Sequence, residues 1–505
     1  MCLKMSKYML ISEFYTLYNQ HPAITTDSRV CPSGSIFFAL KGESFDGNAF
    51  AEKALQAGCA YAVIDDTSYC TGNPDSVSTP SKSIVTDEGL PYADNRIILV
   101  DDVLSTLQQL ACFHRDTLGI PVIGITGTNG KTTTKELTAA VLSKKYNTLY
   151  TQGNLNNHIG VPLTLLRLTR EHEIAVIEMG ANHPGEIRDL ANIALPDYGL
   201  ITNVGYAHLE GFGSFEGVVR TKGELFDFVQ KADGKIFINR DDENLTGIAE
   251  GLEQITYGIT PVFEGSVEER DNINNNTNAN EKAPFVSGKI LGRHPFLSLA
   301  WQQQDGATQH SVQTHLVGDY NLWNVLAAIA IGVYFDIAPE QINDAIENYE
   351  PSNNRSQLMR TEHNTLVIDA YNANPSSMRA ALENFASPSE ANPESPVNTQ
   401  PDSSITKPSI NTIESLPKAI ILGDMLELGE KSPELHADIL KLAETLDIEK
   451  ILLCGEQFSA VGKGHICFPS VEALDDFLKE KPLFGYNILI KGSHGIHLEK
   501  IIKRL

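Results

Sequence analysis

A glycine-rich segment at residues 125–134, ITGTNGKTTT, has the residue types that bind phosphate groups. Two residues separate Gly127 from Gly130 and five separate Gly124 from Gly130, so the strict phosphate-loop pattern, with four residues between its glycines, is not met. The Gly-Lys-Thr ending is intact, and we expect Lys131 to reach the outer phosphates and the Thr132 hydroxyl to contact Mg²⁺. The predicted nucleotide-binding residues of the segment are Gly127, Thr128, Asn129, Gly130, Lys131, Thr132 and Thr133.

The flanks of this segment favour phosphate binding over an ordinary turn that carries a solvated lysine. Residues 120–126, IPVIGIT, are typical of a short buried strand, and residues 131–146 predict a helix that begins at Lys131. A helix N-terminus presents unpaired N–H groups and the positive end of its dipole, and glycines let the backbone wrap phosphate oxygens closely. Strand, glycine loop and helix in this order are the setting that a phosphate loop requires.

Three further polar residues stand at or after later apolar runs. Glu178 closes AVIEMG, His208 lies in NVGYAHLEGFGS, and Lys222 lies in RTKGELF. Glu178 is a candidate Mg²⁺ ligand because hard cations prefer carboxylate oxygen. The alternatives are a capping or solvated carboxylate, a hydrogen-bonded structural histidine and a helix-surface lysine, and residue type and spacing leave them open.

Composition limits the class of protein. A chain of 505 residues is too long for one hydrophobic core and predicts two to four domains. A formal net charge of -25 argues against a nucleic-acid binder, because no basic stripe is available to neutralise phosphates. Seven cysteines without C-x-x-C spacing fit reduced thiols better than a disulfide framework or a zinc site. Neither a signal peptide nor a membrane-spanning run is recognisable, so we expect a cytoplasmic protein.

The pattern of elements predicts an α/β protein with three domains. Apolar runs alternate with helical patterns in the middle of the chain and again towards its end, and each run finishes in Gly, Asp or Asn before a helix. Polar stretches near residues 67–83, 264–285 and 386–412 predict exposed loops or insertions. The predicted domains are a first domain at residues 1–110, a central domain with a parallel sheet and the phosphate loop at 111–336, and a C-terminal Rossmann-like domain at 337–505.

Eight segments occur in one order along the chain: GTNGKTT, EMG, NVGYAHLEGFGS, TKGELF, GDYNLWNVLAA, IDAYNANPSSM, LGDMLELGE and KGSHG. In that order they resemble the Mur ligases over nearly the whole chain. The resemblance implies an ATP-dependent, ADP-forming ligase that makes a C–N bond in peptidoglycan precursor synthesis, acting as a monomer without nucleic acid or membrane insertion. ATP would phosphorylate the terminal carboxylate of UDP-N-acetylmuramoyl-tripeptide, and the amine of D-alanyl-D-alanine would attack the acyl phosphate.

The same resemblance implies roles for individual residues. Lys131, Glu178, His208 and Lys222 would be catalytic, with Thr132, Glu178, His208 and a carbamylated Lys222 as Mg²⁺ ligands. Asn324 would lie beside adenine, while Arg355 and Asp369 would reach the γ-phosphate and ribose once the third domain closes over ATP. The family usually has Asp-Gly-His where this chain has Asp-Gly-Asn, which leaves the contact of Asn48 open. The implied substrate-binding residues are Ser28, Arg29, Phe45, Asp46, Gly47, Asn48, Asn154, Asn156, Asn157, Tyr371, Asn372 and Asn374.

Three rival functions are considered. Another amide ligase of the same fold would add a different amino acid to a nucleotide sugar or folate, and the segments DAYNANPSSM and GDMLELGE argue against it. A phosphotransferase that merely uses the phosphate loop would not need Glu178, His208 and Lys222 together. A noncatalytic nucleotide-binding scaffold would not need a complete set of candidate metal ligands.

Overall fold

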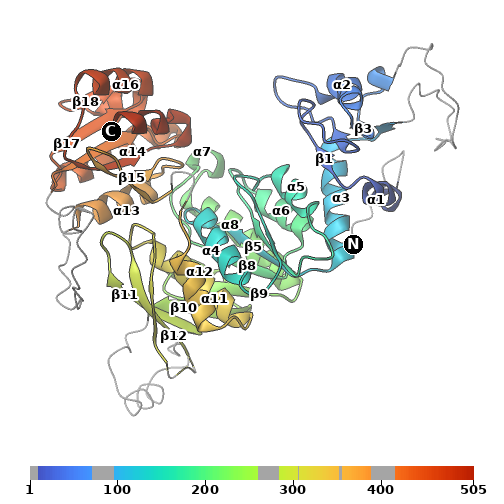
Figure 1. Cartoon of the computed structure of the whole chain (residues 1–505), viewed down its shortest axis with the longest axis horizontal. Helices are drawn as coiled ribbons and strands as arrows, with labels where there is room; N and C mark the ends of the chain where they lie inside the picture. Colours follow the sequence, from blue (N-terminus) through green and yellow to red (C-terminus); the bar gives the residue numbers. More distant parts are fainter. Residues whose placement is uncertain are drawn as a thin grey trace, which may run out of the picture. The chain divides into compact units, whose positions relative to one another are not determined.

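The computed structural model describes residues 10–70, 96–259, 284–304, 306, 308–351, 355–387 and 416–505. The chain forms two compact units, which are coloured along the sequence in Figure 1. The stretches predicted as loops near 67–83, 264–285 and 386–412 lie mostly outside the described residues. The first unit comprises Met1–Gly124, Asn147–Gly180 and Glu186–Tyr198, and the second comprises Ile125–Tyr146, Ala181–Gly185 and Gly199–Leu505.

The first unit begins with a four-stranded parallel sheet in the order β1-β2-β3-β4. Its short apolar strands pack against α2 through Phe37, Ala54 and Ile64, which are almost completely buried. The long helix α3 ends at Gly119, which adopts the left-handed conformation that favours glycine at a helix C-terminus. The elements are α1 (Ile11–Gln20), β1 (Ile24–Thr25), β2 (Ile36–Phe38), η1 (Gly47–Phe50), α2 (Ala51–Gln56), β3 (Tyr61–Ile64), η2 (Thr67–Cys70), β4 (Ile97–Leu99) and α3 (Val103–Leu118).

The rest of the first unit is built on three neighbouring strands in the order β5-β7-β6. Strands β5 and β7 are buried along their whole length, as expected of parallel strands covered on both faces. Arg115 on α3 pairs with Asp197 at 2.6 Å, and Asp197 also accepts the N–H of Val122 at 2.8 Å, which anchors the start of β5. The elements are β5 (Val122–Thr126, whose last two residues belong to the second unit), β6 (Thr148–Tyr150), α5 (Gly160–Leu165), β7 (Ile174–Glu178) and α6 (Glu186–Ala194).

The second unit contains strands in the order β8-β9-β10-β11-β12-β13. Strands β9, β10 and β11 are parallel, whereas β11, β12 and β13 are antiparallel. Helix α11 is apolar on almost every side because it packs against α4, α12 and strands β9 to β12. The elements are α4 (Lys131–Leu142), β8 (Tyr198–Ile201), α7 (Leu209–Phe212), α8 (Phe215–Lys231), β9 (Lys235–Asn239), α9 (Glu243–Gly247), β10 (Glu253–Ile259), β11 (Val286–Gly292), β12 (Ser298–Gln303), β13 (His310–Gln313), α11 (Asn321–Tyr334) and α12 (Pro339–Glu347).

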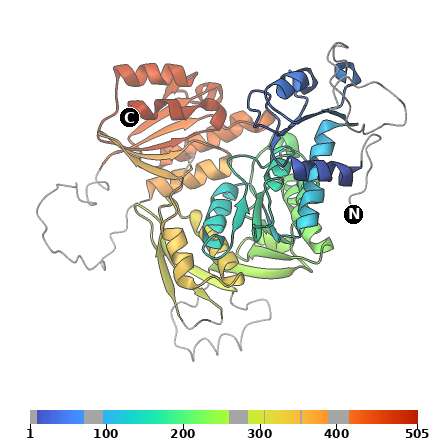
Figure 2. The same ribbon diagram turned by 45° about the vertical axis from the view of Figure 1, so that its right-hand side comes forward.

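The C-terminal part of the second unit is a six-stranded sheet in the order β14-β15-β19-β16-β17-β18, parallel except for the edge strand β14. Alternate residues of its strands point to opposite faces, so Ile421 packs with α16 on one side and Ile420 with α13 and α14 on the other. Figures 1 and 2 show helices on both faces of this sheet. The elements are β14 (Gln357–Arg360), β15 (Thr365–Asp369), α13 (Pro375–Ala386), β16 (Lys418–Gly423), η4 (Gly429–Lys431), α14 (Ser432–Thr445), β17 (Lys450–Cys454), α15 (Glu456–Val461), β18 (Ile466–Phe468), α16 (Val471–Glu480), β19 (Asn487–Lys491), η5 (His494–Ile496) and η6 (Leu498–Arg504).

The predicted α/β fold class is confirmed, with two differences in detail. The antiparallel strands β12 and β13, which extend the sheet beyond β11, were not predicted. The helix predicted over residues 131–146 ends at Leu142, since Lys145 and Tyr146 turn away to bond the carbonyl oxygen of Phe335. The three-domain division stays a prediction, and α3 continues across its first boundary at residue 110. Within the ranges that the structure describes, no helix combines the length and apolar character needed to cross a bilayer.

Candidate active site

The glycine loop joins β5 to α4 and is held by the segment that follows β8. The Asn129 carbonyl oxygen accepts hydrogen bonds from the Thr202 hydroxyl at 2.6 Å and from the Asn203 amide at 3.0 Å. The Asn129 N–H donates in turn to Asn203 Oδ1 at 3.0 Å. Because Thr202 and Asn203 directly follow a buried strand, the loop has a fixed shape on this side. Such a loop at a helix N-terminus is suited to bind an anion.

Lys131, the first residue of α4, turns its side chain back over the loop. Its Nζ donates to the carbonyl oxygens of Gly127 at 2.7 Å and Thr128 at 3.0 Å. The ammonium group therefore lies where the positive end of the α4 dipole also acts, and the two charges add. This position agrees with the predicted role of Lys131 at the outer phosphates of a nucleotide, a role that stays a prediction.

Gly130 is the N-cap of α4, and its environment explains why glycine stands there. Its φ is 79°, in the left-handed region, and a Cβ atom at this position would lie 2.4 Å from Oδ1 of Asn324. Asn324 is only 5% exposed; its Oδ1 accepts from the Thr134 hydroxyl at 3.0 Å and its Nδ2 donates to Asn321 at 2.9 Å. The structure thus places Asn324 as a buried support of the loop, and its predicted contact with adenine stays a prediction.

The C-terminal sheet reaches the glycine loop through Asn374. This residue caps α13, because its Oδ1 accepts the N–H of Ser377 at 2.9 Å. Its Nδ2 donates to Oδ1 of Asn129 at 2.7 Å. Asn129, which was predicted to bind the nucleotide, and Asn374, which was predicted to bind the substrate, are therefore in direct contact within the second unit.

Asp369 ends β15 and forms an ion pair that the sequence reasoning missed. Lys491, at the end of the neighbouring strand β19, is 1% exposed and donates to Asp369 Oδ2 at 2.5 Å. It also donates to the carbonyl oxygen of Asn372 at 3.3 Å, so one lysine holds both the carboxylate and the loop after it. The signal was present in the sequence, since both residues end apolar runs and pair in register in the parallel sheet.

Arg355 and Tyr371 also meet. The Arg355 guanidinium carbon lies 3.7 Å from the centre of the Tyr371 ring, a cation–π contact. The same ring also stacks with His494, at 5.4 Å between centroids and with 23° between the planes. The stack restricts the orientation of the guanidinium, which the family resemblance assigns to the γ-phosphate.

His208 and Lys222 come from the segment after β8 and from α8. Lys222 is 2% exposed, and its Nζ lies 5.5 Å from the centre of the Phe212 ring. Nδ1 of His208 contacts Oε2 of Glu427, a residue of the segment LGDMLELGE, and this contact lowers the pKa of the Glu427 carboxyl below its usual value. Glu427 was not predicted as a site residue.

Glu178 lies in the first unit at the end of β7 and is 1% exposed. Its Oε1 accepts from Nδ2 of Asn156 at 2.8 Å, and its N–H donates to the Thr151 hydroxyl at 2.9 Å. Asn157 instead holds the turn that leads into α5, because its Oδ1 accepts the N–H groups of Ile159 at 3.1 Å and Gly160 at 2.9 Å. Of the three asparagines predicted to contact substrate, the structure thus brings Asn156 to the carboxylate, while Asn154 is exposed.

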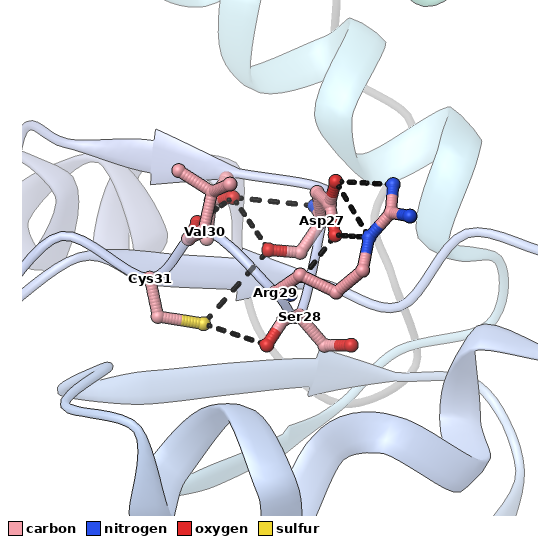
Figure 3. A network of polar contacts seen from close by, with 6 residues as sticks. Asp27, Ser28, Arg29, Val30 and Cys31 are labelled. Atoms are coloured by element: carbon pink, nitrogen blue, oxygen red, sulfur yellow. Dashed lines mark hydrogen bonds and ion pairs between the residues drawn. The ribbon is translucent and has the colours of Figure 1, made fainter.

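The segment Asp-Ser-Arg in the first unit is shown in Figure 3. The Arg29 guanidinium donates to both carboxylate oxygens of Asp27, from Nε to Oδ1 at 2.9 Å and from Nη2 to Oδ2 at 2.8 Å. This pairing lowers the pKa of Asp27 to about 2. The Arg29 side chain is still 81% exposed, so an anionic ligand has access to it. Ser28 contributes its carbonyl oxygen to Cys31 Sγ at 3.5 Å.

Asn48, the departure from the family pattern, is buried and fully engaged by the protein. It is 1% exposed; its Nδ2 donates to Asp46 at 2.7 Å and Asp65 at 2.9 Å, and its Oδ1 accepts the Asp65 N–H at 3.0 Å. Lys41 completes the cluster with an ion pair to Asp65 at 2.7 Å. Phe45 is exposed. The substrate contacts predicted for Phe45, Asp46, Gly47 and Asn48 stay predictions, and for Asn48 the structure shows a supporting role.

Comparison with known proteins bears on both units. A model described as the Mur ligase middle domain matches residues 125–332, and one described as the Mur ligase family catalytic domain matches residues 22–115. The chain is 33% identical over 496 residues to the UDP-N-acetylmuramoyl-tripeptide–D-alanyl-D-alanine ligase of Bacillus subtilis, covering 95% of this chain and 92% of the relative. The enzyme of the same name from Escherichia coli is 32% identical over 494 residues, covering 96% and 93%.

Two solved structures are also similar to this chain over most of its length. A crystal structure of MurF from Acinetobacter baumannii has a TM-score of 0.73 and 28% identity, covering 95% of this chain and 92% of that one. A MurF ligase from Thermotoga maritima in complex with ADP has a TM-score of 0.71 and covers 95% and 96%; at 23% identity it bears on the fold alone.

Proposed function

The chain belongs to the Mur ligase family, and from that membership we propose that it joins D-alanyl-D-alanine to UDP-N-acetylmuramoyl-tripeptide at the expense of ATP. The product is the UDP-N-acetylmuramoyl-pentapeptide precursor of peptidoglycan, with ADP and phosphate. Family membership supports the further proposals that the enzyme works in the cytoplasm and as a monomer. Light scattering on the purified protein tests the second of these.

The chemistry requires activation of a carboxylate. A carboxylate is a poor electrophile because its oxygen is a poor leaving group, so the γ-phosphoryl group of ATP is first transferred to it. The amine nitrogen of the dipeptide then attacks the carbonyl carbon, the C–O bond to phosphate breaks, and the amine gives up a proton. Lys131 and the N-terminus of α4 would neutralise the phosphoryl oxygens during the first step.

Mg²⁺ is part of the proposal. Among the described residues, no three His, Cys, Asp or Glu side chains gather into a group that could hold a metal ion. That is compatible with Mg²⁺, which keeps several waters and binds one or two carboxylates together with phosphate oxygens. Thr132, Glu178 and His208 would hold it, and the ion would neutralise charge on the phosphates. Lys222 could join them only as a carbamate, because its ammonium form repels a cation.

One observation favours a ligase over a phosphotransferase that merely uses a phosphate loop. The hydrogen bond from Asn374 to Asn129 ties the cap of α13 in the C-terminal sheet to the glycine loop. A simple phosphotransferase has no need of a second α/β sheet at its phosphate loop. A ligase needs one, because a second substrate must attack the acyl phosphate while water is kept away.

The test is phosphate release from ATP and Mg²⁺ with UDP-N-acetylmuramoyl-tripeptide, measured with and without D-alanyl-D-alanine. Tripeptides containing diaminopimelate and lysine are both assayed, and the product is identified by its mass. Dipeptide-dependent release with a pentapeptide product is expected. Phosphate release that no amine stimulates, or absence of a pentapeptide with either tripeptide, would contradict the proposal.

A further inference from the structure

The segment KGSHG, residues 491–495, begins at the last residue of β19 and borders the loop that follows β15. Its first residue, Lys491, donates to the carbonyl oxygen of Asn372 in that loop at 3.3 Å. The hydroxyl of Ser493 donates to the carbonyl oxygen of Ala373 at 3.5 Å. Two side chains of KGSHG thus hold the backbone of two successive residues in the loop.

KGSHG is itself packed tightly against the end of β16. A Cβ atom on Gly492 would lie 2.9 Å from Cα of Gly423, so glycine is needed where the two backbones approach. The Ser493 N–H donates to the carbonyl oxygen of Asp424 at 3.1 Å, and the Ser493 hydroxyl accepts the N–H of Leu426 at 3.0 Å. Because β16 is buried along almost its whole length, KGSHG is a fixed support for the loop beside it.

Two aromatic side chains connect this support to Arg355. His494 stacks on the Tyr371 ring with 5.4 Å between the ring centroids, and the guanidinium carbon of Arg355 lies 3.7 Å from the centre of the same ring. The face of an aromatic ring is electrostatically negative, so it attracts a guanidinium cation. All three residues belong to the second unit, and both neighbours share the ring of Tyr371.

Arg355 is held in a way that leaves hydrogen-bonding capacity unused. A contact with a ring face does not require the N–H groups of the guanidinium to form conventional hydrogen bonds. Nε is buried and has no hydrogen-bond partner within the part of the chain that the structure describes. A buried donor without an acceptor is unfavourable, which indicates that an acceptor arrives with a ligand. The planar fork of a guanidinium matches the oxygens of a phosphate group.

Arg115 in the first unit shows the contrasting arrangement. It is 6% exposed; its Nε donates to the carbonyl oxygen of Ala194 at 3.2 Å, and its Nη2 donates to the carbonyl oxygen of Leu195 at 2.8 Å and to Asp197 at 2.6 Å. The protein itself supplies these acceptors, so Arg115 is structural. Arg355 is instead held by a ring, which fixes its position and keeps its donors available.

We propose that Tyr371 and His494 are positioning residues, which hold the guanidinium of Arg355 so that its N–H groups bind the γ-phosphate of ATP. The inference rests on the proposed function, in which ATP is the phosphoryl donor. Lys491 and Ser493 contribute by fixing the loop that carries Tyr371. KGSHG thereby determines how well the enzyme distinguishes ATP from ADP, without touching the nucleotide itself.

The variants separate the ring contact from other effects. Tyr371→Leu removes the ring, while Tyr371→Phe keeps the ring and removes only the hydroxyl. His494→Leu removes the second ring at an exposed position, so folding should be preserved. His363→Leu is the matched control, because His363 is also exposed and contacts an aromatic ring, that of Phe484 at 4.5 Å, near the other end of β15.

The first readout needs no turnover. Calorimetric titrations with ATP and with ADP, each with Mg²⁺, give the ratio of the two affinities, which measures recognition of the γ-phosphate. Tyr371→Leu should lower this ratio at least about fivefold, as expected when a partly buried cation–π contact is lost. Tyr371→Phe should restore most of that loss, His494→Leu should lower the ratio by a smaller factor, and His363→Leu should keep the wild-type ratio. An unchanged ratio in Tyr371→Leu, or equal ratios in His494→Leu and His363→Leu, would overturn the proposal.

A double variant distinguishes positioning from direct contact with the nucleotide. Arg355→Met removes the charge, so a residue that acts through Arg355 should have no further effect in that background. Tyr371→Leu combined with Arg355→Met should therefore show the same ratio of affinities as Arg355→Met alone. Losses that add in the double variant would mean that Tyr371 contacts ATP directly, and they would contradict the proposal.

The second readout is the steady-state rate of dipeptide-stimulated phosphate release. Tyr371→Leu and His494→Leu should lower kcat/KM for ATP and leave KM for D-alanyl-D-alanine unchanged. A change confined to KM for the dipeptide would assign KGSHG to dipeptide binding and refute its role at the γ-phosphate. Failure of the wild type to release phosphate would instead contradict the proposed function, while the ratio of ATP to ADP affinity still tests the stack.

Discussion

Replacing Gly130 by alanine tests the physical account of the glycine loop, and Gly119 provides a matched control. Both glycines have left-handed backbones, with φ of 79° and 63°, so alanine at either position costs roughly 1–2 kcal/mol in backbone strain. Around Gly119 there is nothing within 4 Å of an added Cβ, whereas at Gly130 the Cβ would come within 2.4 Å of Oδ1 of Asn324. The difference in unfolding free energy between the two variants therefore measures the effect of the collision with Asn324.

The size of that difference follows from the burial of Asn324. The amide is 5% exposed, and moving it away breaks its 3.0 Å hydrogen bond with the Thr134 hydroxyl. A buried polar group without a partner costs about 1–3 kcal/mol. We therefore expect Gly119→Ala to destabilise the protein by roughly 1–2 kcal/mol and Gly130→Ala by roughly 2–5 kcal/mol.

Thermal unfolding and calorimetric titration with ATP measure the two consequences. Gly130→Ala should lower the unfolding midpoint more than Gly119→Ala and should weaken ATP binding at least about tenfold, because the loop N–H groups are displaced. Gly119→Ala should bind ATP as the wild type does. Asn324→Ala should cost less in the Gly130→Ala background than in the wild type, because there it also relieves the collision between the new Cβ and the Asn324 side chain. Equal midpoints for the two glycine variants, or unchanged ATP affinity in Gly130→Ala, would refute the reasoning.

Three further predictions concern single side chains. Lys131→Met should reduce phosphate release at least about 100-fold, as expected when a preorganised charge at the transferring group is lost. Lys144 is an exposed lysine paired with Asp344, so the control variant Lys144→Met should be active. Equal rates of phosphate release in the two variants would contradict the role of Lys131. Asn374→Ala removes both a helix cap and the bond to the glycine loop, so it should lower kcat, whereas Ser470→Ala, which removes the cap of α16, should lower only stability, by about 1 kcal/mol. Burial lowers the pKa of His436 below its ordinary 6.5, so the contribution of the neutral ring to stability is complete above pH 6.5 and is lost as the pH falls further. Between pH 7.5 and 5.5 the urea unfolding midpoint should therefore fall less steeply with pH in His436→Gln than in the wild type. An equal pH dependence of the midpoint in the two proteins would exclude His436 as the cause.

Much of the fold and part of the site could be predicted from sequence, because the signals were local. Apolar runs with helical patterns between them predicted the α/β class, and nearly every run identified as a strand forms one. The glycine loop was predicted in its setting, since a strand, a loop and the N-terminus of α4 at Lys131 are adjacent along the chain. Strands β12 and β13 were missed, because they form an antiparallel edge of the sheet only by pairing in turn, β12 with β11 and β13 with β12.

The sequence by itself determined which residue types are available and which of them stand at strand ends and helix N-termini. Tertiary structure alone decided which of those residues meet. Asn129 and Asn374 are 245 positions apart, and Asp369 and Lys491 are 122 apart, yet each pair is hydrogen-bonded. Glu427 was recognisable as part of a motif, but only packing of two distant segments assigns it to His208. The physical reason is that local patterns depend on neighbours along the chain, whereas partners across a site depend on the order in which strands and helices pack in space.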